Sequence, residues 1–119
     1  MRRLALVSLM ALLGACASAP VPSLELNRAR DAVARAQTAG AADYAPVDYK
    51  MAREGLDGGR ALITQREHTA AKQTLQKAEI RAELAIMKST AARLRAEVQV
   101  KESENVDLRR ELLGEGQVP

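Results

Sequence analysis

The chain of 119 residues has no phenylalanine, no tryptophan and only two tyrosines, and alanine makes up much of its apolar content. Without large rings, such a chain cannot fill the thick core of a globular domain or line a sizeable apolar ligand pocket. It can bring helices close together along thin seams of small side chains. So few aromatic residues also provide no platform on which nucleic-acid bases would stack.

Histidine and cysteine are equally scarce, with one residue of each, so the usual zinc sites cannot be assembled. We expect the single histidine, His68, to lie in a solvated turn between helices. No serine or threonine has the histidine and acid partners of a catalytic triad. We therefore expect no enzymatic activity, no metal and no cofactor.

Strong charge of one sign is also missing. The net charge of +3 falls to +1 if the segment holding Arg2 and Arg3 is removed, because 16 basic and 15 acidic side chains remain. No block of lysine or arginine forms the basic patch that nucleic-acid binding requires. We expect no nucleic-acid partner.

No apolar run is long enough to cross a bilayer, which takes roughly 20 residues. Residues 4–13 form an apolar run of ten, preceded by Arg2 and Arg3 and followed by Gly14 and Ala15. This layout is typical of a secretory signal peptide. We expect residues 1–15 to be such a signal.

The segment Leu13-Gly14-Ala15-Cys16 resembles the lipobox of bacterial lipoproteins. A lone cysteine in an exported chain forms no internal disulfide. The resemblance implies that the signal is cut before Cys16 and that fatty acids such as palmitate anchor this residue to the membrane. The following residue, Ala17 in place of aspartate, implies the periplasm-facing outer membrane. The alternative is an ordinary signal peptide that ends near a cysteine by chance.

A proline-bearing tether, residues 16–23, precedes the first of three predicted helices. Residues 24–39 repeat apolar side chains at intervals of three and four, which marks one helical face. Ser23 is suited to cap the start of this helix, and Gly40 to end it. We expect its inward side chains to be Leu26, Ala29, Val33 and Ala36.

The second predicted helix, residues 46–65, follows a turn at 41–45 and begins with Pro46, whose missing N–H would be unpaired there anyway. Its glycines, at 55, 58 and 59, each cost about 1 kcal/mol relative to alanine. One interpretation is a break at 57–59. We favour a continuous helix in which Gly55 and Gly59 let an alanine-faced neighbour approach closely. We expect its inward side chains to be Tyr49, Ala52, Leu56 and Ile63.

The third predicted helix, residues 69–113, contains no glycine or proline. Because the first two helices are much shorter, they can cover it only to about Thr90, and residues 91–113 should project. Ion pairs Arg93–Glu97 and Glu97–Lys101 are expected on its surface. We expect its buried side chains to be Ala71, Leu75, Ala78, Ala82 and Ala85. The fold class is therefore an all-α, three-helix antiparallel bundle with a long, projecting third helix and a flexible tail at 114–119.

The projecting segment carries a coiled-coil heptad pattern. Its a positions are Leu84, Ala91, Val98, Asn105 and Leu112, and its d positions are Met87, Leu94, Lys101 and Leu108. An asparagine at a fixes the register of parallel dimers. We expect a partner helix, from a second copy or another envelope protein; the alternative is a solitary charged helix. The candidate partner-binding residues are Leu94, Val98, Asn105, Leu108 and Leu112.

Residues 28–90 resemble the bacterial domain of unknown function 4398. The matching pieces are Ala32–Ala39, Tyr44-Ala45-Pro46, Ala52-Arg53 with Leu56, and Ala70–Ala85. The resemblance implies a small lipoprotein of the cell envelope and transfers no catalytic residues. The expected function is a structural or adaptor module that docks an envelope partner. The alternative is a chaperone-like module for periplasmic or lipidic cargo, which requires an exposed apolar groove or a basic lining.

Overall fold

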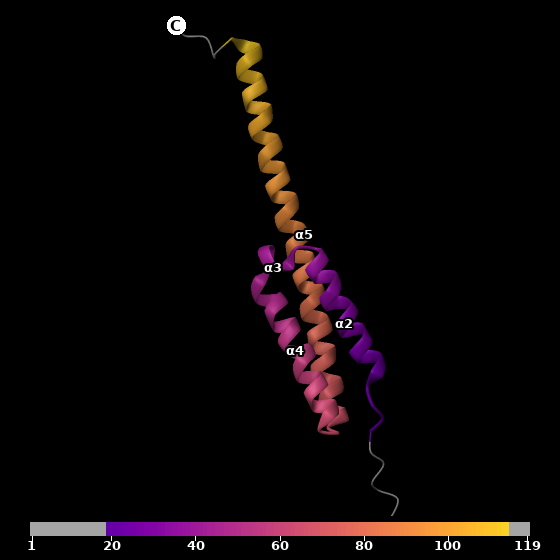
Figure 1. Cartoon of the computed structure of the whole chain (residues 1–119). Coiled ribbons are helices and arrows are strands. Elements are labelled where there is room, and N and C mark those ends of the chain that lie inside the picture. Colours follow the sequence, from indigo (N-terminus) through magenta and orange to yellow (C-terminus); the bar gives the residue numbers. More distant parts are fainter. Residues whose placement is uncertain (1–18, 115–119) are drawn as a thin grey trace, which may run out of the picture.

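The computed structural model describes residues 19–114, which contain helices and no strand. The helices are α2 (Ser23–Thr38), α3 (Ala41–Tyr44), α4 (Pro46–Thr64) and α5 (His68–Leu113). Figure 1 shows α2, α4 and the first half of α5 side by side, with the rest of α5 extending beyond them alone. The all-α fold with a projecting last helix is as predicted.

Helix α2 starts one residue earlier than predicted, at Ser23. The N–H of Leu26 donates a hydrogen bond of 3.0 Å to the carbonyl of Pro22, so Pro22 takes the capping position and Ser23 the first helical one. The prediction that Ser23 caps the helix is therefore wrong. The other end is as predicted, because Gly40 adopts a left-handed φ of 78° and its N–H bonds the Gln37 carbonyl.

The predicted turn at 41–45 contains the short helix α3. Its first residue, Ala41, is fully buried, and the N–H of Tyr44 donates to the carbonyl of Gly40 at 3.1 Å. Pro46 then opens α4, as expected for a residue without an N–H. The chain thus reverses between α2 and α4 within a few compact residues.

Helix α4 runs without a break through Gly58 and Gly59, which confirms the continuous-helix prediction. An added Cβ at Gly55 would lie 3.0 Å from the Cβ of Ala78, so here a glycine does face an alanine of α5. At Gly59 the neighbour is instead Leu75, whose side chain fills the space that a Cβ would need. The two glycines therefore let α4 approach α5 closely.

The inner face of α5 comprises Ala71, Leu75, Ala78, Ala82, Ala85 and Ser89, and all six are buried. Against it pack Ala29, Ala32, Val33 and Ala36 of α2 and Tyr49, Ala52 and Leu56 of α4. Two residues predicted to face inward, Leu26 and Ile63, are only partly buried at the edge of this core. The core is therefore a thin layer of small side chains.

Burial along α5 stops abruptly after the bundle. Ser89 is fully buried, Ala91 and Ala92 are half-buried, and every residue from 93 to 113 is exposed. At ~1.5 Å per residue, this exposed segment is about 30 Å long. The predicted projection is confirmed. Of the helices in residues 19–114, none has an apolar stretch long enough to cross a membrane.

The glycines of α4 provide a matched test of this packing. We expect Gly59→Ala to lower stability by about 1–3 kcal/mol, because its Cβ would overlap the fully buried Leu75. Gly58→Ala is the control: its Cβ would lie 3.8 Å from Thr74 Cγ2, and alanine should stabilise the helix by about 0.5–1 kcal/mol. Urea unfolding of residues 17–119, followed by circular dichroism, measures both. Equal effects of the two changes would contradict the packing.

Candidate docking surface on helix α5

The described part of the chain holds no cluster of metal-ligating side chains. The single histidine was predicted to lie in a solvated turn. Instead, it is the first residue of α5. His68 is half-buried, and its Nδ1 is buried with no hydrogen-bond partner among the described residues. In the turn that precedes it, Arg66 takes a left-handed φ of 64°.

The predicted partner-binding residues lie on the exposed part of α5. The apolar ones, Leu94, Val98, Leu108 and Leu112, are between 54% and 86% exposed, and Asn105 is exposed as well. Large apolar side chains in water at helical spacing are characteristic of a surface that a partner covers. The other predicted site residue, Cys16, lies outside the described residues.

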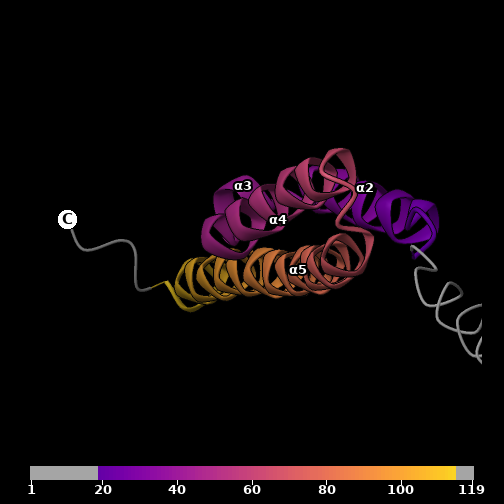
Figure 2. The ribbon, with the colours of Figure 1, turned by 90° about the horizontal axis from the view of Figure 1, so that it is seen from below.

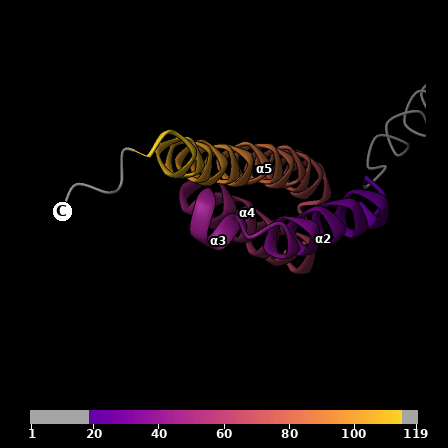
Figure 3. The ribbon, with the colours of Figure 1, turned by 90° about the horizontal axis from the view of Figure 1, so that it is seen from above.

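These residues point away from the bundle. Each residue turns a helix by about 100°, so Met87 and Leu94 lie about 200° and 140° from the buried Ser89. Figures 2 and 3, which look along the molecule from its two ends, show α2, α3 and α4 on one side of α5 and its other side uncovered. The candidate docking surface is thus opposite the inner face.

The docking surface begins alongside the bundle. Ile80 lies one heptad before Met87, and both side chains are 63% exposed. Sequence reasoning started the pattern at Leu84 and missed Ile80, although the same heptad spacing contains it. The outer face of α5 is defined here as Ile80, Leu84, Met87, Ala91, Leu94, Val98, Lys101, Asn105, Leu108 and Leu112.

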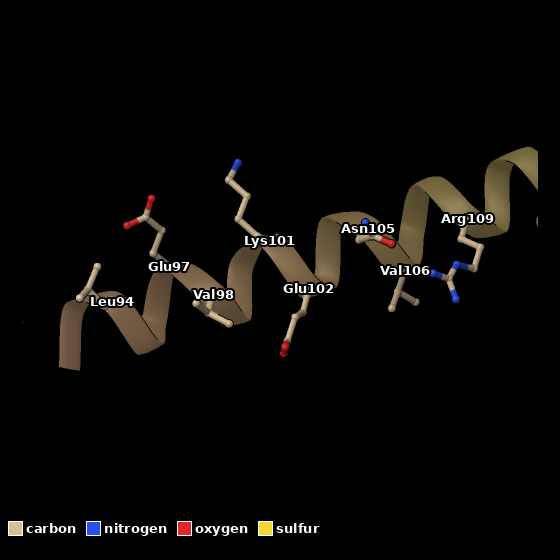
Figure 4. A pocket seen from close by; sticks show the side chains of 8 residues that line it. All are labelled: Leu94, Glu97, Val98, Lys101, Glu102, Asn105, Val106 and Arg109. Carbon is tan, nitrogen blue, oxygen red and sulfur yellow. The ribbon is translucent and has the colours of Figure 1, made fainter. Parts of the chain in front are cut away.

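Charged side chains flank the outer face on both sides. Figure 4 shows Glu97 on one flank and Glu102 and Arg109 on the other, with Val98 and Asn105 between them; Lys101, a member of the outer face, is directed to the side of Glu97. Together with Leu94 and Val106, these residues line a shallow groove along the helix. A single helix cannot enclose a small molecule, so this groove is suited to another helix.

The ion pairs of the projecting segment differ from those predicted. Within residues 19–114, Arg93–Glu97 and Glu97–Lys101 are not paired; Lys101 instead lies 2.9 Å from Glu104. Arg110 similarly lies 3.4 Å from Asp107. Side chains three apart are also neighbours on a helix, so these pairs replace the predicted spacing of four.

One buried carboxylate connects α4 to α5. Asp48 is only 8% exposed, and its two oxygens accept hydrogen bonds from Arg81 at 3.1 Å and Lys88 at 2.5 Å. The hydrogen bond from Lys88, with that from Arg81, lowers the pKa of Asp48 against the opposing effect of burial. Because the partners are 33 and 40 residues away, no local pattern in the sequence could have revealed this cluster.

Two further ion pairs connect α2 to α5. Lys72 lies 3.3 Å from Glu25, and Arg35 lies 4.0 Å from Glu83. The charges therefore attach α2 and α4 to the first half of α5. Within the described residues, the outer face has no tertiary ion pair from Leu94 onward.

Fold and surface together define an all-helical bundle protein with an extended, uncovered helix. The chain belongs to the family described as a domain of unknown function, DUF4398, whose profile matches residues 24–101. The match includes the whole bundle and the start of the projecting segment. No curated protein and no solved structure matches the chain.

The Asp48 cluster predicts a specific pH dependence. The lowered pKa means that Asp48 stabilises the fold above the ordinary aspartate pKa of about 3.9, and that this stabilisation is lost as the pH falls through the lower folded value. We therefore expect Asp48→Asn to lower Tm at neutral pH, and the Tm gap from wild type to close as the pH falls below about 4.

Thermal unfolding of residues 17–119 at several pH values checks this. Asp31→Asn, at an exposed position on α2, is the control and should leave Tm near the wild-type value throughout. A Tm gap for Asp48→Asn that stays constant down to the lowest pH would show that Asp48 does not act through its charge.

Proposed function

We propose that this protein is a lipoprotein of the bacterial outer membrane, anchored through Cys16 and facing the periplasm, that acts as a structural adaptor. The projecting half of α5 docks an envelope partner. The observation that carries the proposal is the exposed apolar outer face of α5, which continues about 30 Å beyond the bundle at ~1.5 Å per residue.

The direction of the chain supports an adaptor. Figure 1 places the start of α2 and the tip of α5 at opposite ends of the molecule. Residues 19–22, which lead into α2, thus leave the bundle at the end far from Leu113. A lipid on Cys16 would hold that end at the membrane, and the docking surface would be presented away from it.

The sequence before α2 supports the anchor. Leu13-Gly14-Ala15-Cys16 follows a basic and then apolar segment, in the order that a lipoprotein signal requires. Two or more acyl chains on one cysteine give a stable membrane attachment. Ala17 in place of aspartate favours the outer membrane.

A chaperone-like function is less well supported. Cargo binding requires a concave apolar surface between elements, whereas the uncovered surface of this chain lies on one convex helix. Helix-to-helix docking needs only a heptad pattern with charged flanks, and the outer face of α5 has both.

The anchor is tested by metabolic labelling with a fatty-acid analogue. We expect label in the wild-type protein, which should fractionate with the outer membrane, and none in Cys16→Ser, because no other residue carries the thiol that accepts the lipid. Ser18→Cys in the Cys16→Ser chain is the matched control: it restores a thiol outside the lipobox register and should stay unlabelled. Labelled Cys16→Ser would overturn the anchor.

The docking surface is tested by formaldehyde crosslinking of intact envelopes. We expect the wild-type chain to give a discrete larger product, and Val98→Glu with Leu108→Glu to lose it, because charge on the outer face opposes apolar docking. The matched control, Ala96→Glu with Ser103→Glu, adds the same charges to the opposite, equally exposed side of α5. Loss of the product in both pairs would contradict a docking surface confined to the outer face.

A further inference from the structure

We infer that the helix docked on the outer face of α5 is the α5 of a second copy of this chain, aligned parallel and in register. This inference deepens the proposed function and rests on it for the docking role of α5. It adds the identity of the partner, its direction and the residues that meet.

The outer face is long enough for a stable pair of helices. From Ile80 to Leu112 it spans about 50 Å at ~1.5 Å per residue, which is more than four heptads. Coiled-coil pairing becomes a consistent signal at about three to four heptads. Over this length only Lys101 and Asn105 interrupt the apolar a and d positions.

The bundle leaves room for the second copy. The inner face of α5 contacts α2 and α4, whereas Ile80 and Met87 on the outer face are exposed at the level of the bundle. Two copies paired through their outer faces would keep both bundles on the outside of the pair. Because each pairing position meets itself, one surface serves both copies.

The flanking charges favour a parallel pair. The g positions, on one flank, are Glu83, Thr90, Glu97, Glu104 and Glu111, and the e positions, on the other, are Lys88, Arg95, Glu102 and Arg109. A parallel pair places g of one copy against e of the other, whereas an antiparallel pair places g against g and e against e. Parallel pairing therefore matches an acidic flank with a mainly basic one.

Beyond the bundle, Glu104 would meet Arg109 of the second copy. Glu83 and Lys88 already have partners in their own chain, Arg35 and Asp48. Glu97 would meet Glu102, which is unfavourable. Antiparallel pairing would place glutamates against glutamates along the whole of one flank.

Asn105 supports the same register. At an a position of a parallel pair, the two asparagines meet and can hydrogen-bond only when the helices are aligned. Both copies would also share one direction if Cys16 anchors each of them to the same membrane. Asn105, the flanking charges and the proposed anchor at Cys16 all favour a parallel, in-register pair.

Disulfide crosslinking of the full-length chain in its own membranes tests the inference. Single cysteines replace Leu94, Val98, Leu108 or Leu112, and Ala96→Cys and Ser103→Cys, on the opposite side of α5, are the controls. We expect all four outer-face variants to form disulfide dimers on mild oxidation and both controls to remain monomers. The wild-type chain, with Cys16 alone, gives the background.

Each alternative gives a different pattern. Dimers from at most one outer-face position would indicate antiparallel pairing and overturn the inference, as would equal dimer yields from the controls. Disulfides only to a protein of another mass would overturn it too, while leaving the adaptor function in place. A wild-type dimer of equal yield would contradict the anchor and overturn the inference as well, because Cys16, which every variant carries, would then account for the disulfides.

A change of charge tests the direction of the pair independently, because it should raise the dimer yield of a parallel pair and lower that of an antiparallel one. In the Val98→Cys chain, Glu102→Lys turns the unfavourable contact with Glu97 into an ion pair if the helices are parallel, and dimer yield at limiting oxidant should rise roughly threefold. In an antiparallel pair the same lysine would add to a basic flank and lower the yield, which would overturn the inference. Ser103→Lys, on the opposite side, is the control and should leave the yield unchanged.

Discussion

The close approach of α4 to α5 is the constraint on which the rest of the molecule depends. Leu75 is the largest fully buried apolar side chain, and it occupies the space left by the missing side chain of Gly59. One helical turn away, Gly55 meets Ala78. With no phenylalanine or tryptophan in the chain, dispersion contacts must come from backbones held near each other. Small residues on the facing helices make that distance attainable.

A core this thin does little by itself to fix the position of one helix along another, since rows of alanines can slide past one another. Ion pairs between helices supply the missing register. Asp48 lies in the first turn of α4 and contacts both Arg81 and Lys88, which are two turns apart on α5. This arrangement fixes where α4 begins along α5. Lys72 and Arg35 do the same for α2 through longer ion pairs that are more exposed than the Asp48 cluster.

The helices of the bundle differ greatly in length. Helices of 16 and 19 residues cannot cover one of 46, so the second half of α5 has no partner among residues 19–114. An isolated helix in water depends on its own ion pairs and on helix-forming residues, and this segment has both. Its exposed apolar side chains add nothing to that stability. Their heptad spacing is the basis of the proposed docking of a second helix.

The sequence by itself determined the helix boundaries to within about one residue at most ends, the inner face of α5 except Ser89, and the point where the bundle stops. Helical periodicity is a local property, and the lengths of the predicted helices show how far they can cover one another. It also determined the residues of the outer face, except Ile80. Ser23 and His68 were placed wrongly: Pro22 takes the capping position of α2, and His68 is itself the first residue of α5. Only the tertiary structure decided that Gly59 faces a leucine, that Asp48 pairs across 33 and 40 residues, and that the outer face lies on the side of α5 that the bundle leaves uncovered. Each depends on how one helix is rotated against another, and that rotation is set by packing between segments far apart in the chain.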